Sequence, residues 1–295
     1  MESTGSTRLV LTPDAVEACR ALQKRHGKSY YLATRFFPED LQLATYALYA
    51  FFRIPDEIVD AAGADPERAR ADLLAWKARW SEAYAGQPTN DPVMRAAAAV
   101  CRAYAIPFEY SESFLEAMLQ DTVKDRYATY AELESYMYGS AAVVGLMMTH
   151  VIGYSDVAAL AYARRLGEAM QLTNFLRDIR EDLETRGRIY LPQDELARFG
   201  ITEAQLRDGR SDRAWKRFMK FQIARADELY AKAEIGIPML DARGRRAVRI
   251  ASRLYRQILR QIERQRYDVF SGRAIVPMWR KWLILAKEAL LCQAT

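Results

Sequence analysis

The stretch QLTNFLRDIRED, residues 171–182, has the spacing of a helix that carries a polar stripe along one face. An α-helix turns by about 100° per residue, so residues four apart lie on the same side. Gln171, Asn174, Asp178 and Asp182 therefore form one row of amide and carboxylate groups. Like charges at this spacing cost an isolated helix about 0.2–0.5 kcal/mol, so the row indicates side chains that bind a cation.

A second acidic cluster, DEIVD at residues 56–60, repeats this pattern. Tyr49, Arg53, Asp56 and Asp60 fall on one face of the helix that the surrounding apolar residues predict. Either cluster alone is also typical of solvated surface charge in a chain with 27% charged residues. Together they predict one metal site between two helices. Oxygen ligands favour Mg²⁺, with Mn²⁺ as the alternative, and two histidines are too few for a site built from imidazoles.

The rest of the chain predicts an all-α fold. Apolar residues recur at three- and four-residue spacing over long windows, without strand-like alternation between hairpin signals. Glycine and proline breaks divide the chain into roughly nine or ten helices. None of these breaks is a long low-complexity linker, so the 295 residues predict a single domain over residues 1–295, flexible at residues 1–11.

Composition and patterning exclude several classes of protein. Residues 1–11 contain one arginine and no long apolar run, unlike a secretory signal. The most apolar stretch, residues 141–152, is shorter than the roughly 20 residues that span a bilayer. The 3 cysteines show no CxxC spacing, which is typical of a reducing compartment. These features predict a cytoplasmic protein without a membrane-spanning helix.

The basic turn RGRIYLP, residues 186–192, directly follows the second acidic cluster. Arginines grip phosphate oxygens in bidentate fashion, and a diphosphate also bridges metal ions, so the predicted ligand is a diphosphate ester. The net charge of +5 is compatible with this ligand or with nucleic acid. The most basic stretch, residues 243–266, has apolar residues at helical spacing and indicates a core helix with a charged outer face, so no nucleic-acid partner is expected.

The C-terminal segment PMWRKWLILAKEALL, residues 277–291, combines tryptophans and aliphatic residues with Arg280, Lys281 and Lys287. This composition suits docking on an anionic membrane surface, peripheral to the inner membrane. It is equally typical of a terminal helix packed on the core, and the sequence leaves both interpretations open.

Three segments together resemble the squalene/phytoene synthase family, and most closely its bacterial phytoene synthases: residues 26–60, 138–147 and 171–192. They occur in the family's order and separation, with family-like flanks such as ALYAFFR before the first cluster and RGRIYLP after the second. The resemblance covers most of the chain. It implies the all-α isoprenoid (terpenoid) synthase helical bundle, with the two aspartate motifs facing each other across the mouth of a central cavity.

The resemblance implies roles for matching residues. The implied metal ligands are Asp56, Asp60, Asn174, Asp178 and Asp182. The aspartates would act in catalysis together with Tyr49, Arg53 and Tyr255. The implied substrate-binding residues are Lys28, Tyr30, Arg53, Gln171, Asn174, Arg188, Tyr190 and Arg273. One departure is Pro55, which removes a backbone donor before the first motif and is expected to kink the helix there.

The resemblance also implies a reaction, the Mg²⁺-dependent head-to-head (1–1′) joining of two allylic diphosphates. Ala33 and Thr34 are small where C30-forming relatives carry a bulky aromatic, which favours phytoene from two geranylgeranyl diphosphates through prephytoene diphosphate, without NADPH. One alternative is a C30 product from two farnesyl diphosphates, namely dehydrosqualene, hydroxysqualene or squalene. Another is a non-catalytic helical scaffold, which the intact aspartates disfavour.

Overall fold

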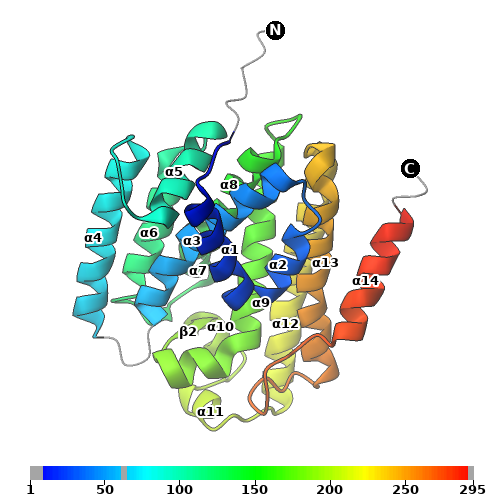
Figure 1. The fold of residues 1–295 in the computed structure, drawn as a ribbon. Helices are drawn as coiled ribbons and strands as arrows, with labels where there is room; N and C mark the ends of the chain where they lie inside the picture. The colour runs from blue at the N-terminus through cyan, green and yellow to red at the C-terminus, as the bar shows by residue number, and fades with distance from the viewer. Residues whose placement is uncertain (1–8, 61–64, 292–295) are drawn as a thin grey trace.

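The computed structural model describes residues 9–60 and 65–291, except for the side chains of residues 28–29 and 287–291. These residues form fourteen α-helices, as Figure 1 shows. The helices are α1 Pro13–His26, α2 Lys28–Thr34, α3 Glu39–Asp60, α4 Pro66–Tyr84, α5 Pro92–Ala103, α6 Phe108–Gln120, α7 Tyr130–Met137, α8 Val143–Ile152, α9 Ala159–Arg186, α10 Gln193–Arg198, α11 Glu203–Arg207, α12 Arg213–Gly236, α13 Ala242–Arg264 and α14 Met278–Leu291. A π-helical turn η1, Tyr138–Ala142, joins α7 to α8, and a 3₁₀ turn η2, Ile237–Met239, follows α12.

The all-α prediction is confirmed, but the described residues contain more helices than the nine or ten predicted. The difference comes from short helices such as α2, α10 and α11, which are too brief to show a hydrophobic period. Gly27 separates α1 from the short helix α2. Residues 1–8, most of the segment predicted to be flexible, lie outside the described residues, whereas Leu9 and Leu11 pack against the core.

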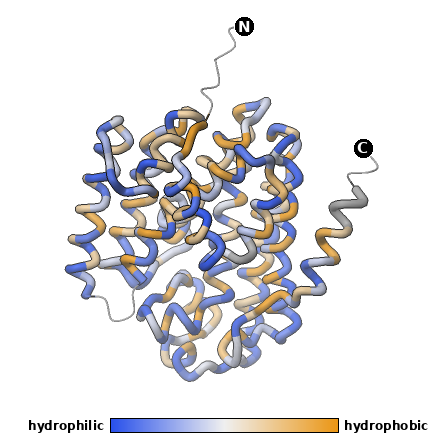
Figure 2. Tube along the Cα trace, viewed as in Figure 1, coloured by the Kyte–Doolittle hydropathy of each residue, from blue (hydrophilic) through white to orange (hydrophobic). Residues whose placement is uncertain are grey.

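Helix α9 runs through the middle of the bundle and packs along α12, with the other helices around it (Figure 1). Hydrophobic and hydrophilic residues alternate along most helices, as amphipathic helices require (Figure 2). Helix α13 buries Ile250, Leu254, Ile258 and Ile262, which confirms that this basic stretch is a core helix. No helix in the described residues combines the length and the apolar character that crossing a membrane requires.

Two short strands were not predicted. β1, Arg126–Tyr127, pairs in parallel with β2, Ile189–Pro192, and all four β2 residues are buried. The Ile189 amide donates to the Asp125 carbonyl at 2.9 Å. This pairing ties the basic turn after α9 to the segment after α6, and so fixes the positions of Arg188 and Tyr190.

Glycines let η1, α8 and α9 approach at backbone distance. A Cβ placed on Gly145 would lie 2.6 Å from the Ala163 carbonyl oxygen, and one on Gly167 would lie 2.5 Å from that of Ala141. Gly145 also lines the central cavity. Close packing and room for a ligand therefore both explain a glycine that would otherwise weaken a helix by about 1 kcal/mol.

We expect Gly167→Ala to lower the free energy of unfolding by about 1–3 kcal/mol, because the added methyl group must push two helix backbones apart. Gly272→Ala is the matched control, since nothing lies within 4 Å of a Cβ at that position. Urea denaturation of both variants measures the difference. Equal midpoints for the two would contradict the close approach of α9 to η1.

Candidate active site

A cavity of about 620 Å³ lies within the bundle and collects most of the predicted site residues. Its walls come from α1, α2, α3, α6, η1, α8, α9 and α13. The predicted residues that line it are Tyr30, Tyr49, Arg53, Asp56, Asp60, Gln171, Asn174, Asp178, Asp182, Arg188, Tyr190 and Arg273. Charged residues gather around the two acidic clusters, while Phe37, Leu48, Met148 and Ile152 line other parts of the wall.

One predicted residue, Tyr255, is not among the described residues that line this cavity. It is buried and packs on Tyr30, with ring centroids 4.9 Å apart. The resemblance implies a catalytic role for Tyr255, which the structure places on α13 in contact with Tyr30 and not among the described residues that line the cavity. Lys28 begins α2, but its side chain lies outside the described residues.

The first acidic cluster ends α3, which continues through Pro55. The kink expected at Pro55 does not interrupt α3, and Tyr49, Arg53, Asp56 and Asp60 all line the cavity. The Arg53 guanidinium donates to Asp56 and, at 3.0 Å, to Glu57. His26, which the sequence did not single out, lies 3.2 Å from Glu57.

The second acidic cluster lies on α9. Asp178 pairs with Arg177 and Arg273, each with an N–O distance of 2.8 Å. Arg273 also lies 3.4 Å from Glu181. The Asn174 side-chain oxygen is buried and has no hydrogen-bond partner, although its amide nitrogen faces Gln171 at 3.4 Å. An acceptor left unpaired in this way is costly unless something binds it.

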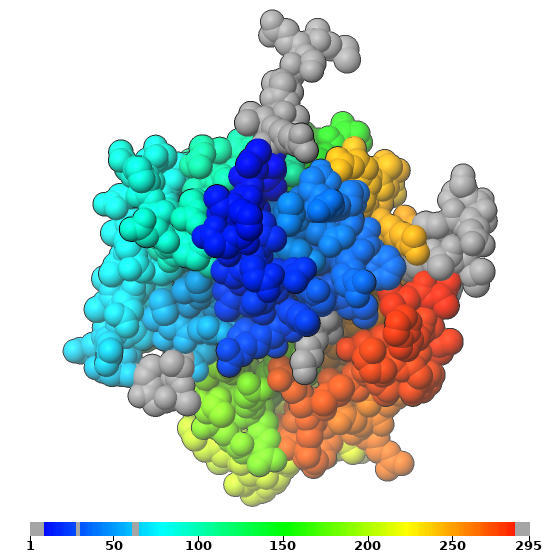
Figure 3. Space-filling model, in the orientation of Figure 1, coloured from blue at the N-terminus to red at the C-terminus, as the bar shows by residue number. Residues whose placement is uncertain are grey.

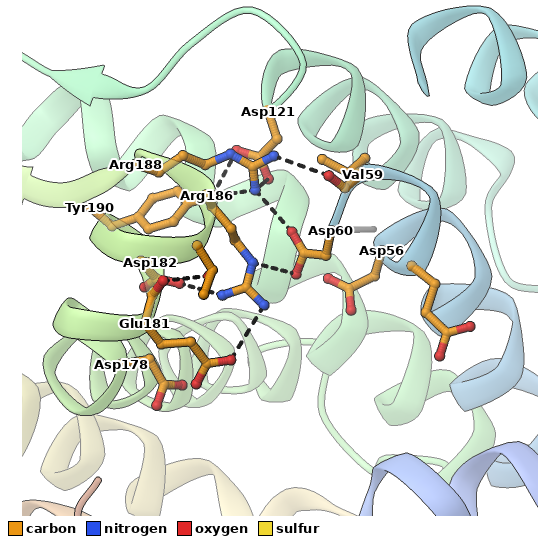
Figure 4. A network of polar contacts seen from close by, with 12 residues as sticks. Asp56, Val59, Asp60, Asp121, Asp178, Glu181, Asp182, Arg186, Arg188 and Tyr190 are labelled. Carbon is orange, nitrogen blue, oxygen red and sulfur yellow. Dashed lines mark hydrogen bonds and ion pairs between the residues drawn. The ribbon is translucent and has the colours of Figure 1, made fainter. Parts of the chain in front are cut away.

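Arginines of the basic turn lie between the two clusters (Figure 4). The Arg186 guanidinium is 3.0 Å from Asp60, 2.8 Å from Asp182 and 3.6 Å from Glu181. Arg188 donates to Asp60 at 3.0 Å and to the Val59 carbonyl at 3.4 Å. The sequence analysis places Arg186 in the basic turn but gives it no site role of its own, although it continues the four-residue spacing of Asp178 and Asp182 by one more turn.

Asp121, just after α6, is a second residue that the sequence did not reveal. Its buried carboxylate accepts hydrogen bonds from Tyr136 at 2.5 Å and Tyr190 at 3.0 Å, and Arg188 lies 3.9 Å away. The Tyr190 ring stacks on Phe175 with centroids 4.4 Å apart. No local sequence pattern marks Asp121, because its hydrogen-bond partners lie on other elements: Tyr136 on α7 and Tyr190 on β2.

Two of the clustered carboxylates, Asp56 and Asp182, have raised pKa values. Burial and then the neighbouring Asp60 raise the pKa of Asp56 to about 6. Burial raises the pKa of Asp182 to about 7, with Arg186 opposing and Asp178 and Asp60 adding to the rise. Bound divalent charge would favour the ionised forms.

The donor set fits a hard divalent cation. Carboxylates of α3 and α9 face one cavity, and the unpaired oxygen of Asn174 lies on the same stripe as Asp178. Within the described residues, no three His, Cys, Asp or Glu side chains already converge as a metal site. The carboxylates of Asp60, Asp178 and Asp182 form ion pairs with arginines, so cation binding requires some of these ion pairs to separate.

Asp121 predicts a pH dependence of stability. Burial raises its pKa from 3.8 to about 7, against the opposing effects of Arg188 and the two tyrosine hydroxyls. The raised pKa means that its contribution to stability is full below about pH 4 and is lost as the pH rises through about 7. We expect the free energy of unfolding to decrease from about pH 5 to about pH 8, and Asp121→Asn to flatten this decrease.

Urea denaturation across this pH range measures the effect. Asp56 and Asp182 shift in the same direction, so part of the slope should remain in Asp121→Asn. A slope equal to that of the wild type would show that Asp121 does not take up the proton.

Comparisons with known proteins agree on one family. A family model described as "Squalene/phytoene synthase" matches residues 23–280. The chain is 38% identical to the 15-cis-phytoene synthase of Synechococcus elongatus, over 94% of this chain and 92% of the relative. It is also 38% identical to the phytoene synthase of Arthrospira platensis, over 92% of this chain and 91% of the relative.

Two solved structures share the fold. A dehydrosqualene synthase in complex with a ligand superposes with a TM-score of 0.88 at 28% identity, covering 96% of this chain and 98% of the other. A squalene synthase from Alicyclobacillus acidocaldarius superposes with a TM-score of 0.79 at 28% identity, covering 86% and 95% of the two chains. The helical bundle around a central cavity is therefore the isoprenoid synthase fold.

Proposed function

The chain belongs to the squalene/phytoene synthase family, and we propose that it is a phytoene synthase. It joins two geranylgeranyl diphosphates head to head, through prephytoene diphosphate, to give phytoene in the first step of carotenoid synthesis. The observation that carries this proposal is the meeting of two aspartate clusters, from α3 and α9, at one apolar cavity. The 38% identity to phytoene synthases over most of the chain supports the C40 product.

In this reaction a diphosphate group leaves twice, first from one substrate and then from prephytoene diphosphate, and the site residues have different roles in these steps. The residues that would hold Mg²⁺ are Asp56, Asp60, Asn174, Asp178 and Asp182. When bound, Mg²⁺ neutralises charge on the departing diphosphate. Arg53, Arg188 and Arg273 donate to diphosphate oxygens, and Arg53 and Arg273 must leave some of their present carboxylate partners to do so.

The rest of the cavity controls the carbocations. Aromatic faces of Tyr49, Phe175 and Tyr190 line the wall close to the acidic clusters and can stabilise positive charge. Apolar residues such as Phe37, Leu48 and Ile152 surround the prenyl tails and exclude water, which would otherwise quench a cation. The protein thus positions the substrates, stabilises charge and excludes water, while the substrates provide the reacting carbons.

Product analysis tests the proposal. Purified protein is incubated with geranylgeranyl or farnesyl diphosphate, with Mg²⁺ or with EDTA, and without NADPH, and the hydrocarbon is identified by mass spectrometry. We expect a Mg²⁺-dependent C40 triene from the C20 substrate. A C30 product alone would assign the chain to another branch of the family, and no product from either intact substrate would favour the scaffold alternative.

We further propose that α14 and the residues before it dock on an anionic membrane surface. Five large apolar side chains are more than half exposed there: Ile275, Met278, Trp279, Trp282 and Leu283. In Figure 3 this segment lies on the outer surface, and Arg280 and Lys281 on the same helix add positive charge. A membrane dissolves both the substrate tails and the product, which supports docking at this site.

Vesicle sedimentation tests this docking surface. We expect Trp279→Gln with Trp282→Gln to weaken binding to anionic vesicles by at least about tenfold, because two large side chains no longer enter the interface. Val157→Gln is the control, because Val157 is an apolar residue that is also more than half exposed, at 70%, but lies outside α14 and the residues before it. Equal binding by the double variant and the control would contradict the proposal.

A further inference from the structure

We propose that Arg186 is a positioning residue that holds the two acidic clusters together before the cation binds and is displaced when cation and diphosphate enter. This inference rests on the proposed function, since it concerns the same aspartates. It adds a residue that belongs to neither cluster. Arg186 would act through Asp60 and Asp182, and not by contact with the reacting carbons.

The contacts of Arg186 span both helices. Its three guanidinium nitrogens reach three different carboxylates: Nε lies 3.0 Å from Asp60, Nη1 lies 2.8 Å from Asp182 and Nη2 lies 3.6 Å from Glu181. Asp60 ends α3, whereas the other two belong to α9. Figure 4 shows the guanidinium between these carboxylates. Without this charge, their mutual repulsion would separate the ends of α3 and α9.

The same carboxylates would coordinate the cation, so Arg186 and the cation compete for them. Both satisfy a buried carboxylate by opposite charge, but a guanidinium has fixed planar geometry whereas Mg²⁺ requires near-octahedral ligands. The two cannot occupy the space between Asp60 and Asp182 together. Binding of Mg²⁺ alone must therefore overcome the ion pairs of Arg186, while a diphosphate brings further ligands for Mg²⁺ and new acceptors for the arginines.

The contact of Arg186 with Asp60 on α3 is weaker than its contact with Asp182 on α9. Arg186 Nη1 makes an aligned hydrogen bond to Asp182, but its buried Nε has no hydrogen-bond partner and contacts Asp60 as an ion pair only. Arg188, by contrast, is 8% exposed and donates to Asp60, Tyr190 and the Val59 carbonyl. Arg186 is therefore the arginine that can release Asp60, while Arg188 stays in place.

The structure also has space for the displaced side chain. A second cavity of about 360 Å³ shares Asp60, Asp121, Arg186 and Arg188 with the large cavity. Arg186 thus forms part of the partition between the two. Thr122 and Asp125 also line the smaller cavity and can accept hydrogen bonds from a guanidinium that moves away from Asp60.

Thermal unfolding tests the proposal without turnover. Wild type, Arg186→Gln, Arg186→Lys and the control Arg180→Gln are each compared in EDTA, in Mg²⁺ alone, and in Mg²⁺ with inorganic diphosphate. Arg180 lies on the same helix, but its guanidinium faces Glu184 and the Phe270 carbonyl, away from the cavity aspartates. The same variants are titrated with Mn²⁺ and followed by electron paramagnetic resonance.

We expect Arg186→Gln to unfold several degrees below the wild type in EDTA and to regain most of that loss in Mg²⁺ alone. The unfolding temperature of the wild type should rise strongly only when diphosphate is present together with Mg²⁺. Arg186→Lys keeps the charge with a single nitrogen, so it should unfold at an intermediate temperature and bind Mn²⁺ alone about tenfold tighter than the wild type, the factor that matches one charge-assisted hydrogen bond given up.

Two results would overturn the proposal. In the first, Mg²⁺ alone raises the unfolding temperature of Arg186→Gln no more than it raises that of the wild type and of Arg180→Gln. If Arg186→Gln does not fold, Arg186→Lys takes its place in this comparison. The second is an unchanged Mn²⁺ affinity in Arg186→Lys. Neither result depends on product formation, so a failure here is distinct from a failure of the phytoene synthase assay.

Discussion

Asp178→Asn is expected to reduce product formation by about two to four orders of magnitude while leaving the protein folded. A divalent cation contributes several kcal/mol to stabilisation of a departing diphosphate, and each 1.36 kcal/mol corresponds to about tenfold in rate. Asparagine has the shape of aspartate but removes the charge that the cation needs. The measurement is the rate of C40 formation at saturating Mg²⁺, with circular dichroism to verify folding.

The matched control for Asp178→Asn is Glu184→Gln. Glu184 lies on the same helix, six residues later, but pairs with Arg180 at the surface, where its side chain is 54% exposed. We expect its activity to remain within about twofold of the wild type, since exposed pairs contribute at most about 1 kcal/mol. An Asp178→Asn enzyme within about tenfold of the wild type would exclude a metal-ligand role for Asp178.

Thr34→Phe is expected to change the preferred substrate from geranylgeranyl to farnesyl diphosphate. Thr34 is 2% exposed and lines the cavity on α2, so a phenyl ring there must occupy space that a C20 tail would use. One methylene too many in an apolar pocket costs about 1–3 kcal/mol, or about 10–200-fold in selectivity. Competition between the two substrates, read out as the ratio of C40 to C30 product, measures the change.

Thr34 also has a structural role that this experiment must separate from size. The Gln23 amide donates to its hydroxyl at 3.1 Å, and Gln23 is 1% exposed. Thr34→Val keeps the volume and removes the hydroxyl, so it should lower the free energy of unfolding by about 1–3 kcal/mol without changing the product ratio. A C30 product from Thr34→Val would show that the hydrogen bond, and not the volume, controls chain length.

The helical stripes could be predicted from the sequence because a single period determines which residues share a face. Gln171, Asn174, Asp178 and Asp182 all line the cavity, as their spacing predicts. Pro55 was expected to disturb the same period on α3, yet the helix continues through it. A proline lacks the donor for one helical hydrogen bond, but Pro55 is itself buried and so are Phe51 and Val59 on either side of it.

The parts that could not be predicted depend on contacts between distant segments. Asp121 becomes part of the site only because β1 and β2 pair, and two strands of this length carry no period of their own. Tyr255 was assigned to the site by resemblance, but it packs against Tyr30, which lines the cavity, and is not itself among the described lining residues. Arg186 had a detectable signal, the continued four-residue spacing, which the neighbouring Gly187 and Arg188 obscured.

The glycine contacts limit where this enzyme can be remodelled by evolution or by engineering. At Gly145 and Gly167 any larger residue meets the backbone of the facing helix, so the wall made by α8 and α9 cannot change gradually. Elsewhere on the cavity wall, Ala33 and Ala251 belong to a small cluster of side chains that includes Ile284 and Leu285 of α14. Side chains can repack where backbones cannot, so variants with new product lengths should arise by changes in α2, α13 and α14.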